Sequence, residues 1–162
     1  SRTIGLQGTF NAEPARIEAG GRYTMRTEDR SIAGLYIKQA ETPNSPGANF
    51  GVARYAMNYG KENNWGIMAT HRMDQQSSAL GTQQSNNTTL TIDGRIRPKD
   101  QLTIQYLLSG ARDNSNDTLG IAGYMYADYS ANKVYLQWLS NFVSSEYYPD
   151  MCFVFQRNVM WA

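Results

Sequence analysis

Few side chains in this sequence have the chemistry that a catalytic or metal-binding site requires. His71 is the only histidine and Cys152 the only cysteine, and the two are far apart in the sequence. Nucleophilic catalysis needs a nucleophile and a base within hydrogen-bonding distance, and a metal site needs a cluster of His, Cys, Asp or Glu. The sequence contains no such motif. We therefore expect His71 to be a surface or interfacial side chain and this chain to have no cofactor, no metal and no enzymatic activity.

Carboxylates are the remaining candidates for chemistry. Glu18 and Asp93 lie within alternating segments, and a pair of carboxylates can in principle cleave a glycosidic bond. Each stands among arginines, which lower the pKa of a carboxyl group, whereas a general acid needs a raised pKa. Asp113 and Asp117, in RDNSND, lack the glycine and the terminal glutamate of an EF-hand calcium loop. We interpret that segment as a polar turn.

The segments that position these residues show the alternation of β-strands. Leu90 and Ile92 alternate with Thr91 and Asp93, and a similar pattern resumes after Pro98. Period-two alternation bounded by a proline-containing turn predicts an antiparallel hairpin. We expect strands mostly of about nine to twelve residues, close to the roughly nine to eleven of a tilted bilayer crossing. The expected strands are 2–7, 15–26, 30–39, 50–58, 64–73, 87–97, 101–111, 118–129, 132–142 and 151–158.

The connections between the expected strands alternate between short and long. The short ones lie at 27–29, 59–63, 98–100 and 130–131. The long ones lie at 40–49, 74–87, 112–117 and 143–150. Transmembrane β-barrels have short turns on the periplasmic side and longer loops outside, so this order favours a barrel with the long connections on the extracellular side.

The two faces of the expected strands differ in chemistry. One face is apolar, and in a barrel it would contact lipid; its members are Ala15, Ile17, Ala19, Leu35, Ile37, Met57, Leu90, Ile92, Ile104, Leu108, Ile121 and Val134. The other face carries charge of both signs and would line the lumen; its members are Arg16, Glu18, Arg22, Lys38, Arg54, Arg72, Asp93, Arg95, Gln105, Gln137 and Arg157. Aromatic residues near the strand ends fit the girdles of a membrane barrel; they are Tyr23, Tyr59, Trp65, Tyr129 and Trp138.

The composition sets limits on the class of protein. The chain has 162 residues, a net charge of +1, 41% hydrophobic residues and eleven tyrosines. This length suits one domain, and the charge gives no reason to expect nucleic acid as a partner. Apolar runs are too short for a transmembrane helix. We expect residues 1–162 to be a single β-barrel region that is a fragment of a longer chain.

Two all-β folds explain these patterns. The first is an antiparallel up-and-down barrel of the transmembrane type, or a partial barrel of about ten strands. The second is a soluble ligand-binding module, a sandwich or a small barrel, in which the Leu and Ile side chains form an internal core and the charged face is wet. We favour the first.

Four stretches of the sequence resemble a Gram-negative cell-surface family. The stretches are SRTIGL, the block NFGVARYAMNYGKENNWGIMATHR, the segment NNTTLTIDGRIRPKDQLTIQ and EYYPDMCFVFQRN. In this family a carbohydrate-binding module of the family-nine type precedes a C-terminal region of unknown function, thought to be an outer-membrane β-barrel. The matching residues are Arg2, Ile4 to Leu6, Asn49, Phe50, Val52, Arg54, Gly66, Thr70, Arg72, Pro149, Phe153 and Val154. The chain departs from the pattern at Thr3 and Cys152.

The resemblance implies that this chain is a barrel wall in the cell outer membrane, with outer-membrane lipid as its partner. The expected work is passage, display or surface binding of a ligand. A carbohydrate ligand would be held by a module outside these residues, so sugar binding is not assigned to this chain. A weaker alternative is the non-catalytic part of a surface glycan hydrolase.

Overall fold

The computed structural model describes residues 16–41, 46–75, 86–114, 117–149 and 159–161. These residues form one antiparallel sheet of nine strands, in which each strand pairs with the next along the chain. The strands are β1 Ile17–Arg26, β2 Arg30–Gln39, β3 Ala48–Tyr59, β4 Asn63–Asp74, β5 Asn86–Lys99, β6 Leu102–Asp113, β7 Thr118–Ala131, β8 Val134–Val143 and β9 Val159–Trp161.

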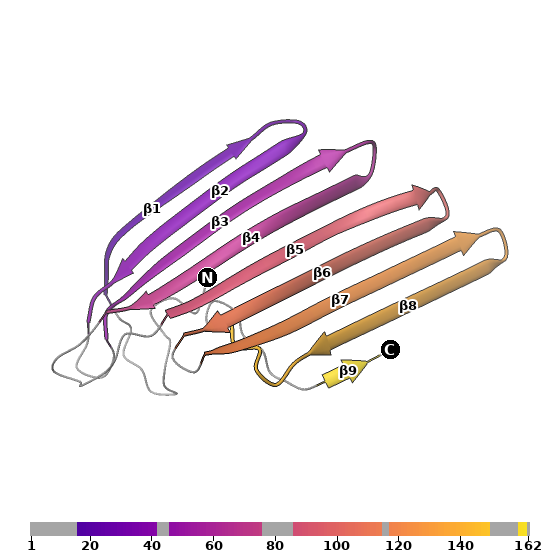
Figure 1. Ribbon diagram of the computed structural model, residues 1–162. Helices are drawn as coiled ribbons and strands as arrows, with labels where there is room; N and C mark the ends of the chain where they lie inside the picture. Colours follow the sequence, from indigo (N-terminus) through magenta and orange to yellow (C-terminus); the bar gives the residue numbers. More distant parts are fainter. Residues whose placement is uncertain (1–15, 42–45, 76–85, 115–116, 150–158, 162) are drawn as a thin grey trace.

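The sheet is a simple meander with two different ends. The four short turns lie together at one end, which we call the turn end, and the longer connections lie at the other, the loop end (Figure 1). Gly60 and Asn132 have φ of 64° and 44° in two of the short turns, and both residue types tolerate this left-handed conformation.

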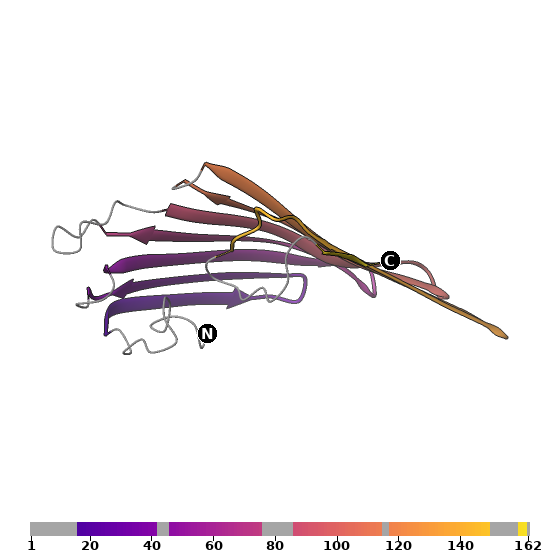
Figure 2. The same ribbon diagram turned by 90° about the horizontal axis from the view of Figure 1, so that it is seen from below.

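The sheet is not closed into a barrel within the described part of the chain. Figure 2 shows the strands twisting progressively, and Figure 1 shows β1 and β8 on opposite sides of the sheet. β9 pairs only with Asn141–Val143 of β8. Among the described strands, none pairs with the remaining seven-residue stretch of β8, 134–140, on the side away from β7, so this part of β8 is an open edge.

Most of the expected strands are confirmed, and the boundaries differ by a few residues. The expected segments 2–7 and 151–158 lie outside the described residues. β5 continues to Lys99, although Pro98 suggested an earlier end; the register shifts between Ile96 and Lys99, and such an irregularity accommodates proline in a strand. β9 was not predicted, because its three residues are too few to show a periodicity.

The register sorts the side chains onto two faces. We call the face with Arg54 and Asp93 the polar face and the face with Leu90, Ile92 and Leu108 the apolar face. Directly paired residues share a face in an antiparallel ladder, and successive residues alternate between faces.

Burial is inverted relative to an ordinary soluble sheet. On the polar face, Thr89, Thr91 and Ser109 are 3%, 6% and 2% exposed. On the apolar face, Leu90, Ile92 and Leu108 are 50%, 42% and 53% exposed. Soluble proteins usually bury their aliphatic side chains and expose their hydroxyls. Buried apolar residues are few in the described part of the chain, namely Ala48, Phe50, Ala111, Ala122 and Tyr147.

β2 is placed differently from the sequence-based expectation. Leu35 and Ile37 pair with Val52 and Phe50 on the polar face, and Lys38 therefore lies on the apolar face. Alternation within a strand separates its two faces, but it does not say which of them continues onto the neighbouring strand. That choice is made by the pairing register. Here the register places Ile37 opposite Phe50 in an apolar patch at the loop end.

Candidate functional site on the polar face

A charged pair spanning three strands lies on the polar face. Arg54 of β3 donates from Nη1 and Nη2 to the two carboxylate oxygens of Asp93 in β5, at 2.7 and 2.8 Å. Between them lies Gly66 of β4, which pairs directly with Asp93. A Cβ at Gly66 would lie 2.9 Å from Nη2 of Arg54. The missing side chain at Gly66 therefore lets the guanidinium cross β4 and form a bidentate contact, the most specific geometry for this pair.

A second charged group lies at the turn end. Glu62, in the turn after β3, accepts a hydrogen bond from Nη1 of Arg97 at 2.5 Å, and Nη2 of Arg95 lies 3.7 Å away. Arg97 also donates to the carbonyl oxygen of Asp100 at 2.6 Å, which ties the β3–β4 turn to the β5–β6 turn. The hydrogen bond from Arg97 lowers the pKa of the Glu62 carboxyl below 4.5, against a smaller opposing effect of desolvation.

The Glu62 contact predicts a pH dependence of stability. A carboxyl group whose pKa is lowered by folding stabilises the folded state above its unfolded pKa, and that contribution is lost as the pH falls through the folded value. We expect the urea midpoint of the parent to exceed that of Glu62→Gln near neutral pH, and the difference to shrink as the pH falls below about 4.5. A difference in urea midpoint that stays constant down to acidic pH would contradict a lowered pKa for the Glu62 carboxyl.

A third charged group lies at the loop end. Arg72 donates from Nε to Asp74 at 2.7 Å and from Nη2 at 3.1 Å, and both side chains are largely buried. The guanidinium carbon of Arg72 lies 5.9 Å from the centre of the Phe50 ring, within the range of a cation–π contact. Charged groups therefore follow the polar face from the turn end to the loop end over β3, β4 and β5.

The segment after β8 folds back onto the polar face. We call Ser144–Pro149 the strap; it is drawn in gold and runs back across the strands (Figure 2). The buried hydroxyl of Tyr147 donates to Ser109 Oγ at 2.8 Å, and that atom lies 2.8 Å from Thr91 Oγ1. The side-chain amide of Asn87 donates to the carbonyl oxygen of Tyr148 at 2.6 Å. These contacts reach from β5 to β6.

The structure brings together only some of the predicted lumen-facing residues. Arg22, Arg54, Arg72, Asp93, Arg95, Gln105 and Gln137 share the polar face. Glu18 lies at a register shift of β1 and forms an ion pair of 2.8 Å with Lys38, so its closest charged partner is a lysine and not an arginine. Arg16 is exposed just before β1, and Arg157 lies outside the described residues.

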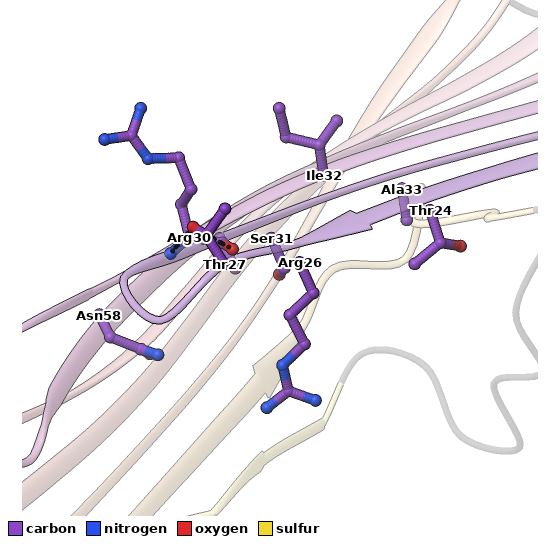
Figure 3. A pocket seen from close by; sticks show the side chains of 9 residues that line it. Thr24, Arg26, Thr27, Arg30, Ser31, Ile32, Ala33 and Asn58 are labelled. Carbon is purple, nitrogen blue, oxygen red and sulfur yellow. Dashed lines mark hydrogen bonds between the residues drawn. The ribbon is translucent and has the colours of Figure 1, made fainter.

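A shallow hollow of about 300 Å³ lies at the turn end of β1–β3. Small side chains line it on the polar face, among them Thr24, Ser31, Ala33 and Ala56. Figure 3 shows Arg26 and Arg30 at its rim, pointing to opposite sides of the sheet. The hollow is open to solvent and has room for about ten water molecules or a small polar solute.

The described residues contain no group of three or more His, Cys, Asp or Glu side chains that could hold a metal ion. His71 is exposed and its Nδ1 lies 2.8 Å from Thr88 Oγ1. None of the described segments is a helix with the length and hydrophobicity needed to cross a membrane.

No protein-family model, curated protein or solved structure matches this chain. The resemblance to the cell-surface family therefore stays a prediction. Sequence reasoning missed the strap, because 143–150 was interpreted only as a loop. The run of small hydroxyl residues facing it, Thr89, Thr91 and Ser109, is a signal that such a surface can be covered.

Proposed function

We propose that this chain is a wall section of an outer-membrane β-barrel, with the apolar face against lipid and the polar face lining a lumen for polar solutes. The observation that carries the proposal is the inverted burial, in which Leu90 and Ile92 are exposed while Thr89 and Thr91 are buried. A lipid-facing surface needs exposed aliphatic side chains, and a lumen needs polar ones.

The strand dimensions and side-chain chemistry support the same proposal. The eight long strands have 10 to 14 residues, enough for a tilted crossing of about nine to eleven residues. Exposed aromatic residues lie near the turn end on the apolar face, where an interfacial girdle belongs; they are Tyr23, Tyr59 and Tyr129. Trp138 is exposed on the same face in the middle of β8.

The sheet has two open edges among the described strands, one at β1 and one at β8, and a complete barrel needs further strands to pair with them. Unpaired backbone groups are costly in hydrocarbon, so a sheet can span a membrane only when its edges are paired. We infer that β1 and the free part of β8 pair with further strands. The work of the complete barrel is passage, display or surface binding of a ligand, with no covalent chemistry in this chain. A carbohydrate ligand is suggested by the resemblance alone.

The experiment that tests the proposal is transfer from buffer to lipid vesicles. We expect aggregation or weak β-structure by circular dichroism in buffer, and a cooperative β signal in phosphatidylcholine vesicles. Lipids brominated on their acyl chains should quench the fluorescence of Trp138, which is exposed on the apolar face. A Trp138→Phe variant is the matched control. A stable β signal in buffer that does not respond to vesicles would instead support the soluble ligand-binding module.

A further inference from the structure

The strap is attached to the sheet by specific contacts at its two ends and its middle. Ser144 exchanges two hydrogen bonds of 2.9 Å with the backbone of Ile121. The ring of Tyr147 packs with Ala111 and Ala122, and its hydroxyl reaches Ser109. Asn87 then holds the carbonyl oxygen of Tyr148. The strap therefore crosses β7, β6 and β5 in turn.

Gly120 makes room for this crossing. A Cβ at Gly120 would lie 2.1 Å from the backbone nitrogen of Tyr147 and 2.2 Å from the carbonyl carbon of Glu146. Both are backbone atoms, which cannot rotate away as a flexible side chain can. Any other residue at position 120 must push the strap off the sheet or distort β7.

The strap covers only the loop end of the polar face. Thr89, Ala111 and Gly120 form one row across β5, β6 and β7, and all three are buried. Gln105, nearer the turn end on the same face, is exposed. In a barrel whose lumen is lined by this face, the strap would therefore narrow one end and leave the other open.

The sheet does not depend on the strap for its own pairing. The β5–β6 and β6–β7 ladders are continuous under it, from Thr89 and Ala111 to Gly120. The Thr89 hydroxyl is buried beside this surface and has no hydrogen-bond partner among the described residues. An unsatisfied buried hydroxyl costs free energy, and displacement of the cover would let water satisfy it. Opening of the strap would therefore be a local event that leaves the strand pairing intact.

We propose that the strap occludes the loop end of the lumen, and that its displacement opens a path for small polar solutes along the hydroxyl-lined face of β5–β7. Occlusion of the lumen rests on the proposed function. Covering of the polar face by the strap rests on the fold alone and does not need a membrane.

The test uses one thiol under the strap. In the full chain, Cys152→Ser removes the native thiol, and Thr89→Cys places a new thiol at a side chain that has no hydrogen bond to any described residue. In detergent micelles, the rate of reaction with a charged methanethiosulfonate reagent should rise by about tenfold or more in Gly120→Ala, because overpacking against a backbone displaces it. The matched control is Gly110→Ala, since Gly110 lies beside β7 but a Cβ there meets no atom closer than 4.0 Å.

The second readout is permeation. In phosphatidylcholine vesicles that contain the chain with both sheet edges paired by further strands, glycine serves as the osmotic solute. Vesicles with the Gly120→Ala variant should swell faster than vesicles with the Gly110→Ala variant. If Gly120→Ala does not fold, Tyr147→Ala serves instead, because it removes the buried ring and its hydroxyl.

The outcomes separate the two proposals. Equal thiol reactivity in Gly120→Ala, Tyr147→Ala and Gly110→Ala would overturn the strap as a cover. Increased reactivity without faster swelling, in vesicles where the chain has inserted, would overturn the strap as an occlusion of the lumen. A chain that never inserts would overturn the proposed function and with it the occlusion, while the micelle experiment would still decide whether the strap covers the face.

Discussion

Leu108→Lys should prevent stable assembly in lipid, whereas Leu107→Lys should be tolerated. The two leucines are neighbours in β6, but Leu108 is on the apolar face, 53% exposed, and Leu107 is on the polar face, 37% exposed. A lysine near the midplane of the lipid face of a barrel costs about 2–4 kcal/mol. A lysine at position 107 lies opposite Asp93 in the register and meets a carboxylate. The free energy of unfolding from vesicles, measured by urea titration, gives the comparison.

The matched pair also separates the membrane reading from the soluble one. A soluble module with Leu108 in an internal core would also be destabilised by lysine at this position, but the loss would already appear in buffer, before any lipid is added. An effect at Leu108 no larger than that at Leu107 in vesicles would therefore count against lipid contact with the apolar face. Secondary structure of both variants in detergent provides the folding control.

Gly123→Ala should lower the free energy of unfolding by about 1–3 kcal/mol, the usual cost of overpacking. Gly123 of β7 pairs with Phe142 of β8, and a Cβ at Gly123 would lie 2.1 Å from a carbon of the Phe142 ring. The ring thus lies over the glycine, an arrangement in which an aromatic side chain covers the backbone that glycine exposes. Thermal or urea unfolding of the parent and the variant measures the loss.

Two further variants test whether the loss of stability comes from the Phe142 ring and not from the replacement of a glycine as such. Gly110→Ala is a change of the same size on the same face with open space around the new methyl group, and we expect an effect within about 0.5 kcal/mol. Phe142→Leu in the Gly123→Ala background should restore part of the stability, since contacting residues are not additive. Additive losses in the double variant would show that the ring and the new methyl group do not compete.

The sequence was sufficient to predict the strands and their hairpins, because alternation and turn residues are local properties. The pairing of β5 with β6 follows from the alternation around Leu90 and Ile92 and from the short turn after β5. The pairing of β7 with β8 follows from the short turn between them. The face of Leu35 and Ile37 was not predictable, because the register between β2 and β3 decides it. The partner of Arg54 needed the same information, since Asp93 lies two strands away across Gly66. The strap depends on a contact between Tyr147 and Ser109, which no local pattern encodes.

The β8 edge that is unpaired among the described strands has a consequence for the chain during its synthesis. Val134, Leu136 and Trp138 are exposed on one face of this stretch, and Tyr135 and Leu139 on the other. An exposed, apolar strand edge is a template for β-pairing between copies, the first step of fibre growth. Copies of this chain that meet before residues 134–140 gain a strand partner should therefore pair through this edge and form insoluble cross-β deposits.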